Sequence, residues 1–229
     1  MDLTELVTFL RGGGARAVDF MDQGGPIVWT IGGVSVLTLA VIIWKVLHLL
    51  RLGAWSGGRR TERAVADWRA GRDAQALERV LNRRSARARV AATAFEALSR
   101  PEFTPADAER DIVRVARGRL AAARSGLKLL ELIATIAPLL GLLGTVVGMI
   151  AAFQALQEAG SRADPAALAG GIWEALLTTA AGMGVAIPAT MAASWFESQV
   201  DRLRRDIEDI CARILLPRKT DAGLRVAAQ

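Results

Sequence analysis

The chain has 229 residues, of which 52% are hydrophobic and 23% charged, and its formal net charge is +6. This composition is too apolar for an ordinary soluble domain and favours a membrane protein. One histidine and one cysteine, Cys211, leave no intrachain disulfide and no metal site built from these two residue types. The sequence also has no phosphate-binding glycine loop, no Ser/His/Asp set and no paired catalytic carboxylates. We therefore expect no enzyme, no catalytic residue and no cofactor.

Residues 1–25 hold Leu3, Leu6, Val7 and Leu10 at helical spacing. The pattern predicts a short amphipathic helix, which either rests on the membrane surface or docks on a neighbouring protein. The segment begins with acidic residues, and no small-residue cleavage site follows the first apolar run. These features argue against a cleavable signal peptide.

The first transmembrane helix is predicted at residues 26–50. Its uncharged run, residues 26–44, is just long enough to span the hydrocarbon core. Trp44, Lys45 and His48 follow at its inner end, where aromatic residues anchor a helix and long cations extend to the interface. We interpret His48 as a residue of the helix end rather than a proton relay.

Residues 51–130 are predicted to form a cytoplasmic helical segment. Within it, Thr104 followed by Pro105 is a helix start, because threonine caps well and proline suits the first helical position. From there the apolar pattern predicts one continuous helical rod over residues 105–156. Gly126 does not argue against this rod, because a lone glycine within a helical pattern is tolerated.

Two further transmembrane helices are predicted, at residues 131–156 and 167–196, with a short loop at 157–166 between them. Both exceed the ~20 residues needed to cross a bilayer. The apolar pattern of the last helix continues into residues 197–229, which we expect to form a cytoplasmic helix and tail. The sequence therefore predicts an all-α polytopic membrane protein with three transmembrane helices and long cytoplasmic helical extensions.

The basic residues indicate the topology. Lys and Arg number 18 in residues 51–128 and 7 after residue 198, but 2 before the first span and 1 in the 157–166 loop. The positive-inside rule then places the N-terminus and the short loop outside, and the 51–128 segment and C-terminus in the cytoplasm. Nucleic-acid binding is a weak alternative, because 9 acidic residues are interspersed in the same segment and no aromatic platform accompanies them. The better partner for the positive charge of this segment is the anionic inner surface of the membrane, that is, membrane lipids.

Small and polar residues mark the last two spans. Gly141, Gly144 and Gly148 recur at spacings of three and four, which favours close helix–helix packing. Thr145 stands among them and either has a function or bonds back to its own helix.

Glu174 is the one charge within the third span, where an ionisable group is costly and usually faces a cavity, a partner or a pathway. In antiparallel helices Thr145 and Thr179 come to similar depth, so the three side chains could form a polar track. A purely structural assembly contact at Glu174 is the alternative.

Two motifs carry a specific resemblance. The sequences APLLGLLGTVVGMIAAF (137–153) and GGIWEALLTTAAGMGVAIPA (170–189) closely resemble the two signatures of the MotA/TolQ/ExbB proton-channel family. The resemblance implies a pentamer in the bacterial inner membrane with a periplasmic N-terminus. It further implies an ExbD/TolR-like single-span protein in the central pore and a TonB-like partner.

The resemblance also assigns roles to residues. It implies a proton path lined by Thr145, Glu174 and Thr179. Thr178 could share or exchange the role of its neighbour on another face of the helix. Helix packing is expected of the remaining positions, Pro138, Gly141, Gly144, Gly148 and Pro188.

Three functions are compatible with these features. We favour an ExbB-like subunit that uses the proton-motive force to energise TonB-dependent transport. A TolQ-type subunit for envelope maintenance and division is the near alternative, and a structural scaffold without ion conduction is the more distant one. Three spans instead of four argue against a flagellar motor subunit.

Overall fold

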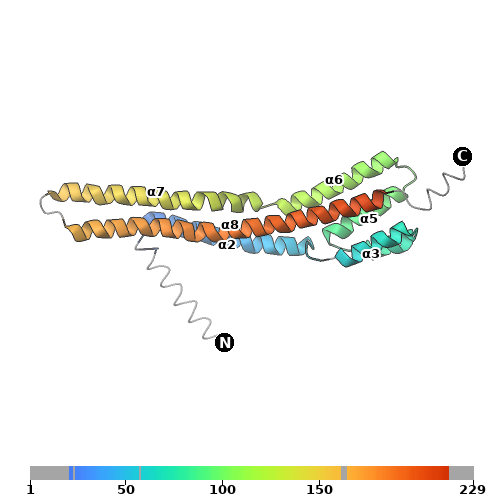
Figure 1. The fold of residues 1–229 in the computed structure, drawn as a ribbon, viewed down its shortest axis with the longest axis horizontal. Helices are drawn as coiled ribbons and strands as arrows, with labels where there is room; N and C mark the ends of the chain where they lie inside the picture. Colours follow the sequence, from blue (N-terminus) through green and yellow to red (C-terminus); the bar gives the residue numbers. More distant parts are fainter. Residues whose placement is uncertain (1–20, 23, 57, 161–163, 217–229) are drawn as a thin grey trace, which may run out of the picture. The chain divides into compact units, whose positions relative to one another are not determined.

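A computed structural model describes residues 21–22, 24–56, 58–160 and 164–216, and these residues form α-helices joined by short turns without a strand (Figure 1). The amphipathic helix predicted near the N-terminus and the tail after residue 216 lie outside this described part. The helices are α2 (Gly25–Arg51), α3 (Gly58–Arg69), α4 (Asp73–Val80), α5 (Ala86–Ser99), α6 (Pro105–Arg124), α7 (Leu127–Ala159) and α8 (Pro165–Leu215).

Three helical stretches are long and apolar enough to cross a membrane, as the sequence predicts. They are Gly25–Arg51, Pro105–Ala159 and Pro165–Leu215. Pro138 lies inside α7 and Pro188 inside α8, and neither ends its helix. Membrane helices tolerate proline because neighbouring groups can satisfy the carbonyl that it leaves without a partner.

The chain divides into two compact units. Unit 1 comprises residues 1–42 and 128–193, and unit 2 comprises residues 43–127 and 194–229. In unit 1, α2, α7 and α8 share one apolar cluster. Its buried members are Ile31, Ile133, Ala137, Val185, Ala186 and Ala189.

Many large apolar side chains of unit 1 point away from this cluster, including Leu139, Leu142, Ile150 and Met191. Such a surface would be unfavourable in water, but it suits contact with lipid or with another membrane helix.

Unit 2 packs helices α3 to α6 together with the C-terminal part of α8. Trp68 of α3 stacks on Phe95 of α5 with ring centroids 4.7 Å apart. The apolar stripe predicted beyond the third span is confirmed, because each of its members is buried: Val200, Leu203, Ile207, Ile210 and Ile214.

The predicted start of α6 is also confirmed. Thr104 is the N-cap, and its Oγ1 accepts a hydrogen bond from the Asp107 backbone N–H at 3.2 Å. Pro105 occupies the first helical position, where a missing N–H costs nothing.

The predicted continuous rod over residues 105–156 is wrong. α6 ends at Arg124 and α7 begins at Leu127. Between them Gly126 has φ +78°, a left-handed conformation that glycine adopts without strain. At this break, side chains of α2 lie within hydrogen-bond distance of three carbonyls, those of Ala122, Ala123 and Ser125.

Lys45 provides two of these contacts, and its Nζ donates to the carbonyls of Ala123 and Ser125, each at 2.6 Å. The expectation that Lys45 extends to the interface is therefore wrong, because its side chain is 0% exposed. A buried ammonium needs acceptors, and the helix break provides them.

His48 completes the junction from the next turn of α2. Its Nε2 lies 2.9 Å from the Ala122 carbonyl, and its ring stacks on Trp44 at 5.1 Å. These contacts agree with the interpretation of His48 as a residue of the helix end.

Candidate functional site

The candidate site lies along the antiparallel seam between α7 and α8 in unit 1. On α7, the seam is lined by the three predicted glycines. A Cβ added at Gly144 would overlap the side chain of Thr178, and one added at Gly148 would lie 3.0 Å from Ala175 Cβ. At Gly141 a Cβ would lie 3.0 Å from the Thr178 carbonyl oxygen. The backbones of the two helices thus approach closely only because these positions lack side chains.

Small residues of α8 complete the seam. A Cβ at Gly182 would lie 2.6 Å from the Ala137 carbonyl oxygen, and one at Gly171 would lie 2.7 Å from Ala152 Cβ. With Ala175 and Thr178, these glycines form a stripe at spacings of four, three and four. This stripe is not among the sequence predictions above, although the helical spacing of its small residues could have indicated it.

Two threonine hydroxyls share one acceptor in the seam. The two donors are Thr178 Oγ1 and Thr179 Oγ1, and each lies 3.1 Å from the Gly141 carbonyl oxygen. Thr178 Oγ1 also lies 2.6 Å from the carbonyl of Ala175 in its own helix. Thr178 is 3% exposed, so it belongs to the packed interface between the two helices.

Thr145 is bonded within its own helix. Its Oγ1 donates to the Leu142 carbonyl at 2.7 Å, which is the local alternative that the sequence left open. The side chain is half-buried and borders a shallow groove on α7, together with apolar residues such as Val146, Ile150 and Phe153.

Glu174 is exposed on α8. A Cβ added at Gly25 would lie 2.9 Å from Glu174 Oε1, so the carboxylate sits beside the first residue of α2. Helix N-termini carry partial positive charge and stabilise nearby anions. Among the residues that the structure describes, no cation forms an ion pair with Glu174.

The structure thus brings some of the expected residues together within one chain and separates others. Thr178 and Thr179 meet at Gly141, whereas no hydrogen bond links Glu174 with either hydroxyl or with Thr145 in the described part of the chain. A continuous track through all three proposed path residues would need water or groups from other chains.

Among the described residues no group of histidine, cysteine and carboxylate side chains could hold a metal ion. The chemistry that the site offers is limited to one carboxylate, backbone carbonyls and hydroxyls. Such groups can bind and release protons and form hydrogen bonds.

Comparisons with known proteins address the same region. A family model for the MotA/TolQ/ExbB proton channel family matches residues 73–209. This range includes all of α7, residues 165–209 of α8 and all residues of the seam.

Individual relatives agree with that match. The biopolymer transport protein exbB1 of Vibrio cholerae is 44% identical over 84 residues, which are 37% of this chain and 37% of the relative. The biopolymer transport protein ExbB of Xanthomonas campestris is 36% identical over 124 residues, 51% of this chain and 47% of the relative. The Tol-Pal system protein TolQ of Haemophilus influenzae is 42% identical over 77 residues, 34% of this chain and 33% of the relative. Each alignment covers less than two thirds of the relative's length.

Proposed function

Because this chain belongs to the MotA/TolQ/ExbB proton channel family, we propose that it is the channel subunit of an inner-membrane complex driven by the proton-motive force. In this proposal the complex is of the ExbB type and energises TonB-dependent transport across the outer membrane. Relatives named biopolymer transport proteins favour this assignment.

The observation that carries the proposal is the exposure of Glu174 on an apolar helix. An ionisable side chain within a membrane-spanning helix is rare, and it usually faces water, a partner or a cavity. An exposed Glu174 therefore favours an assembly in which other chains enclose an aqueous path beside α8. We propose a homopentamer, with Thr145 and Thr179 beside the same path.

The proposed partners follow from this arrangement. An ExbD/TolR-like single-span protein would occupy the central pore, and a TonB-like protein would receive the mechanical work. In the proposed topology the N-terminus lies in the periplasm and the arginine-rich 51–128 segment lies in the cytoplasm. The distribution of basic residues favours this orientation.

The test is proton-motive-force-dependent function in cells that carry Glu174→Ala or Thr179→Val. Matched controls are Glu158→Ala, an exposed carboxylate at the end of α7, and Thr135→Val, whose hydroxyl bonds only to its own helix at the Glu131 carbonyl. Native mass of each complex, purified with its single-span partner, reports assembly.

We expect loss of function with an intact complex for the two path variants and retained function for both controls. Collapse of the oligomer in Glu174→Ala would assign a structural role and favour the scaffold alternative. Full function with full assembly would contradict the proposed path.

A TolQ-type role in envelope maintenance is the second candidate, because a TolQ protein is among the relatives. Deletion of the gene distinguishes the two. Loss of growth on an outer-membrane-transported iron chelate would support the ExbB role, whereas chained cells and detergent sensitivity would support the TolQ role.

A further inference from the structure

Unit 2 contains an open cavity of about 1080 Å³ next to the end of α2, the start of α3 and the turn before α5. Its size is at the upper end of ordinary ligand pockets. The lining includes six arginines and, among the described residues, no carboxylate. The six are Arg51, Arg59, Arg60, Arg79, Arg83 and Arg84.

Most of this positive charge has no protein partner. Arg79 forms an ion pair with Asp67, but in the described part of the chain the other five arginines form none. Like charges gathered around one cavity repel each other, and a bound anion removes this repulsion. Arginine is well suited to phosphate, which its planar guanidinium binds through two parallel hydrogen bonds.

The backbone adds to the same preference. α3 begins at Gly58, which lines the cavity, and its first turn has no acidic residue. The start of α3 therefore borders the cavity without a carboxylate in its first turn, and the N–H groups of a helix start favour anions.

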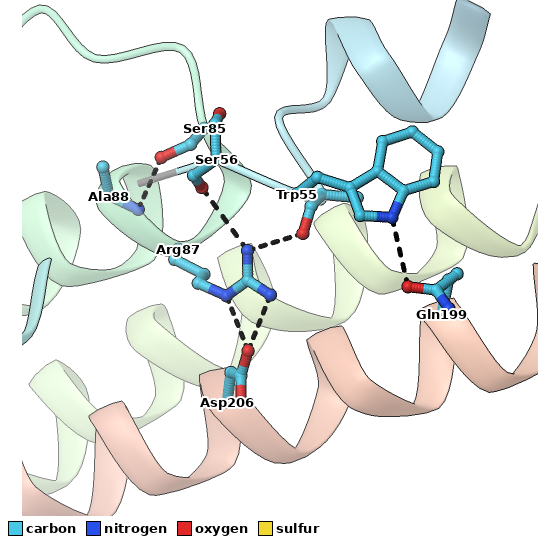
Figure 2. A network of polar contacts seen from close by, with 8 residues as sticks. Trp55, Ser56, Ser85, Arg87, Ala88, Gln199 and Asp206 are labelled. Atoms are coloured by element: carbon cyan, nitrogen blue, oxygen red, sulfur yellow. Dashed lines mark hydrogen bonds and ion pairs between the residues drawn. The ribbon is translucent and has the colours of Figure 1, made fainter. Parts of the chain in front are cut away.

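One wall of the cavity is braced by a separate polar network (Figure 2). Arg87 is buried and donates from Nε to Asp206 Oδ2 at 2.8 Å and from Nη1 to the Ala54 carbonyl at 2.7 Å. Figure 2 also shows Trp55 donating from Nε1 to Gln199 Oε1, at 3.1 Å. Since Asp206 neutralises the charge of Arg87, this arginine stabilises the wall of the cavity. The other arginines remain to bind the anion.

The surroundings of the cavity indicate the origin of the anion. Leu50 and Arg51 lie in the last turn of a helix that is apolar enough to span a membrane, and both line the cavity. Leu50 and Trp55 are exposed beside the arginines. An apolar edge next to a basic cavity fits a phosphate that is attached to acyl chains better than one free in solution.

We propose that this cavity binds the phosphate headgroup of an anionic phospholipid, with the acyl chains passing along Leu50 and Trp55. The inference does not depend on proton conduction, and lipid binding can be measured whether or not the chain conducts.

The test compares four arginine-to-glutamine changes in the cavity with four outside it, in the full-length protein. The cavity variant carries R59Q, R60Q, R83Q and R84Q. The matched control carries R63Q, R69Q, R89Q and R202Q, which remove the same charge from exposed arginines that do not line the cavity. Two pairwise variants, R59Q/R60Q and R83Q/R84Q, guard against loss of folding, which circular dichroism checks.

Each protein is reconstituted in nanodiscs of phosphatidylglycerol with phosphatidylcholine, extracted in mild detergent, and examined by native mass spectrometry for retained lipid. A second arm measures binding of inorganic pyrophosphate to the delipidated protein by calorimetry. We expect phosphatidylglycerol to be retained by wild type and control, and retention to fall by about tenfold or more in the cavity variant.

Pyrophosphate should bind weakly in comparison, and it should not displace the lipid. Equal lipid retention by the folded cavity variants and the control would overturn the proposal. Tight pyrophosphate binding that depends on the four arginines, without any preference for phosphatidylglycerol, would also overturn it in favour of a soluble phosphate compound.

Discussion

Adjacent threonines in α8 show how one carbonyl can hold two helices together. Thr179 donates to the Gly141 oxygen, and the single hydroxyl proton of Thr178 is shared between this oxygen and the Ala175 carbonyl of its own helix. Thr178 is buried in the seam, while Thr179 is only partly buried. We therefore expect Thr178 to contribute mainly to stability and Thr179 to remain accessible to the proposed proton path. The sequence could not separate them, because neighbours on a helix differ by about 100° in direction and the position of α7 was unknown.

Replacement of Thr178 by valine should destabilise the seam moderately. The change keeps the shape of the side chain but removes its hydroxyl, and hydrogen bonds between membrane helices contribute on average ~0.6 kcal/mol and at most ~1.7 kcal/mol. The measurement is thermal unfolding in detergent, monitored through tryptophan fluorescence. Thr178→Ser should retain most of the stability. A Thr178→Val protein as stable as wild type would show that the hydroxyl is dispensable.

At the scale of elements, local signals predicted helix starts better than helix ends. Thr104 and Pro105 define the start of α6 through contacts within four residues, and this start is confirmed. The end of α6 depends on Lys45, which is 78 residues away from Ala123 along the chain. A lone glycine such as Gly126 is compatible with a continuous helix or a break, and tertiary contacts decide between them.

Removing the amine of Lys45 should loosen the α6–α7 junction. In Lys45→Met the carbonyls of Ala123 and Ser125 lose their donor, and each buried acceptor left without a partner costs about 1–3 kcal/mol. Hydrogen exchange should show faster exchange of the amides near residues 122–127. Lys128→Met, at an exposed position in the first turn of α7, is the control and should leave the junction protected. Unchanged exchange in Lys45→Met would mean that the break is stable without this contact.

The α3–α4 pair depends on Asp67, which bridges two arginines. Hydrogen bonds from Arg72 and Arg79 lower the pKa of Asp67 below its ordinary value of 3.8. Because the folded-state pKa is depressed, the stabilisation is present above pH ~4 and is lost as the pH falls through the folded value.

Asp67→Asn should therefore lower the thermal stability at pH 7, and it should flatten the loss of stability that the wild type shows as the pH falls below about 4. Circular dichroism of the full chain measures both effects. Asp111→Asn removes an exposed pair with Arg114 three residues away and is expected to change little. A wild-type melting temperature independent of pH below 4 would contradict the role assigned to Asp67.

For the whole molecule, composition and motif predicted the class and the family, and packing determined the details of the site. Three apolar stretches and two motifs suffice for an all-helical membrane protein of the MotA/TolQ/ExbB family. Sequence spacing left open whether Thr145 bonds to its own helix, and it did not indicate that the hydroxyl of Thr179 is engaged at Gly141. Those details depend on the rotation of α7 against α8, which small residues on both helices set.

The central claim is that Glu174 belongs to a working proton path. The most direct measurement is proton uptake into vesicles that contain the chain and its single-span partner, driven by a potassium diffusion potential and followed with an internal pH-sensitive dye. We predict uptake for wild type and for Glu158→Ala, and background uptake for Glu174→Ala in complexes of unchanged native mass. Uptake by Glu174→Ala equal to that of wild type would contradict the claim.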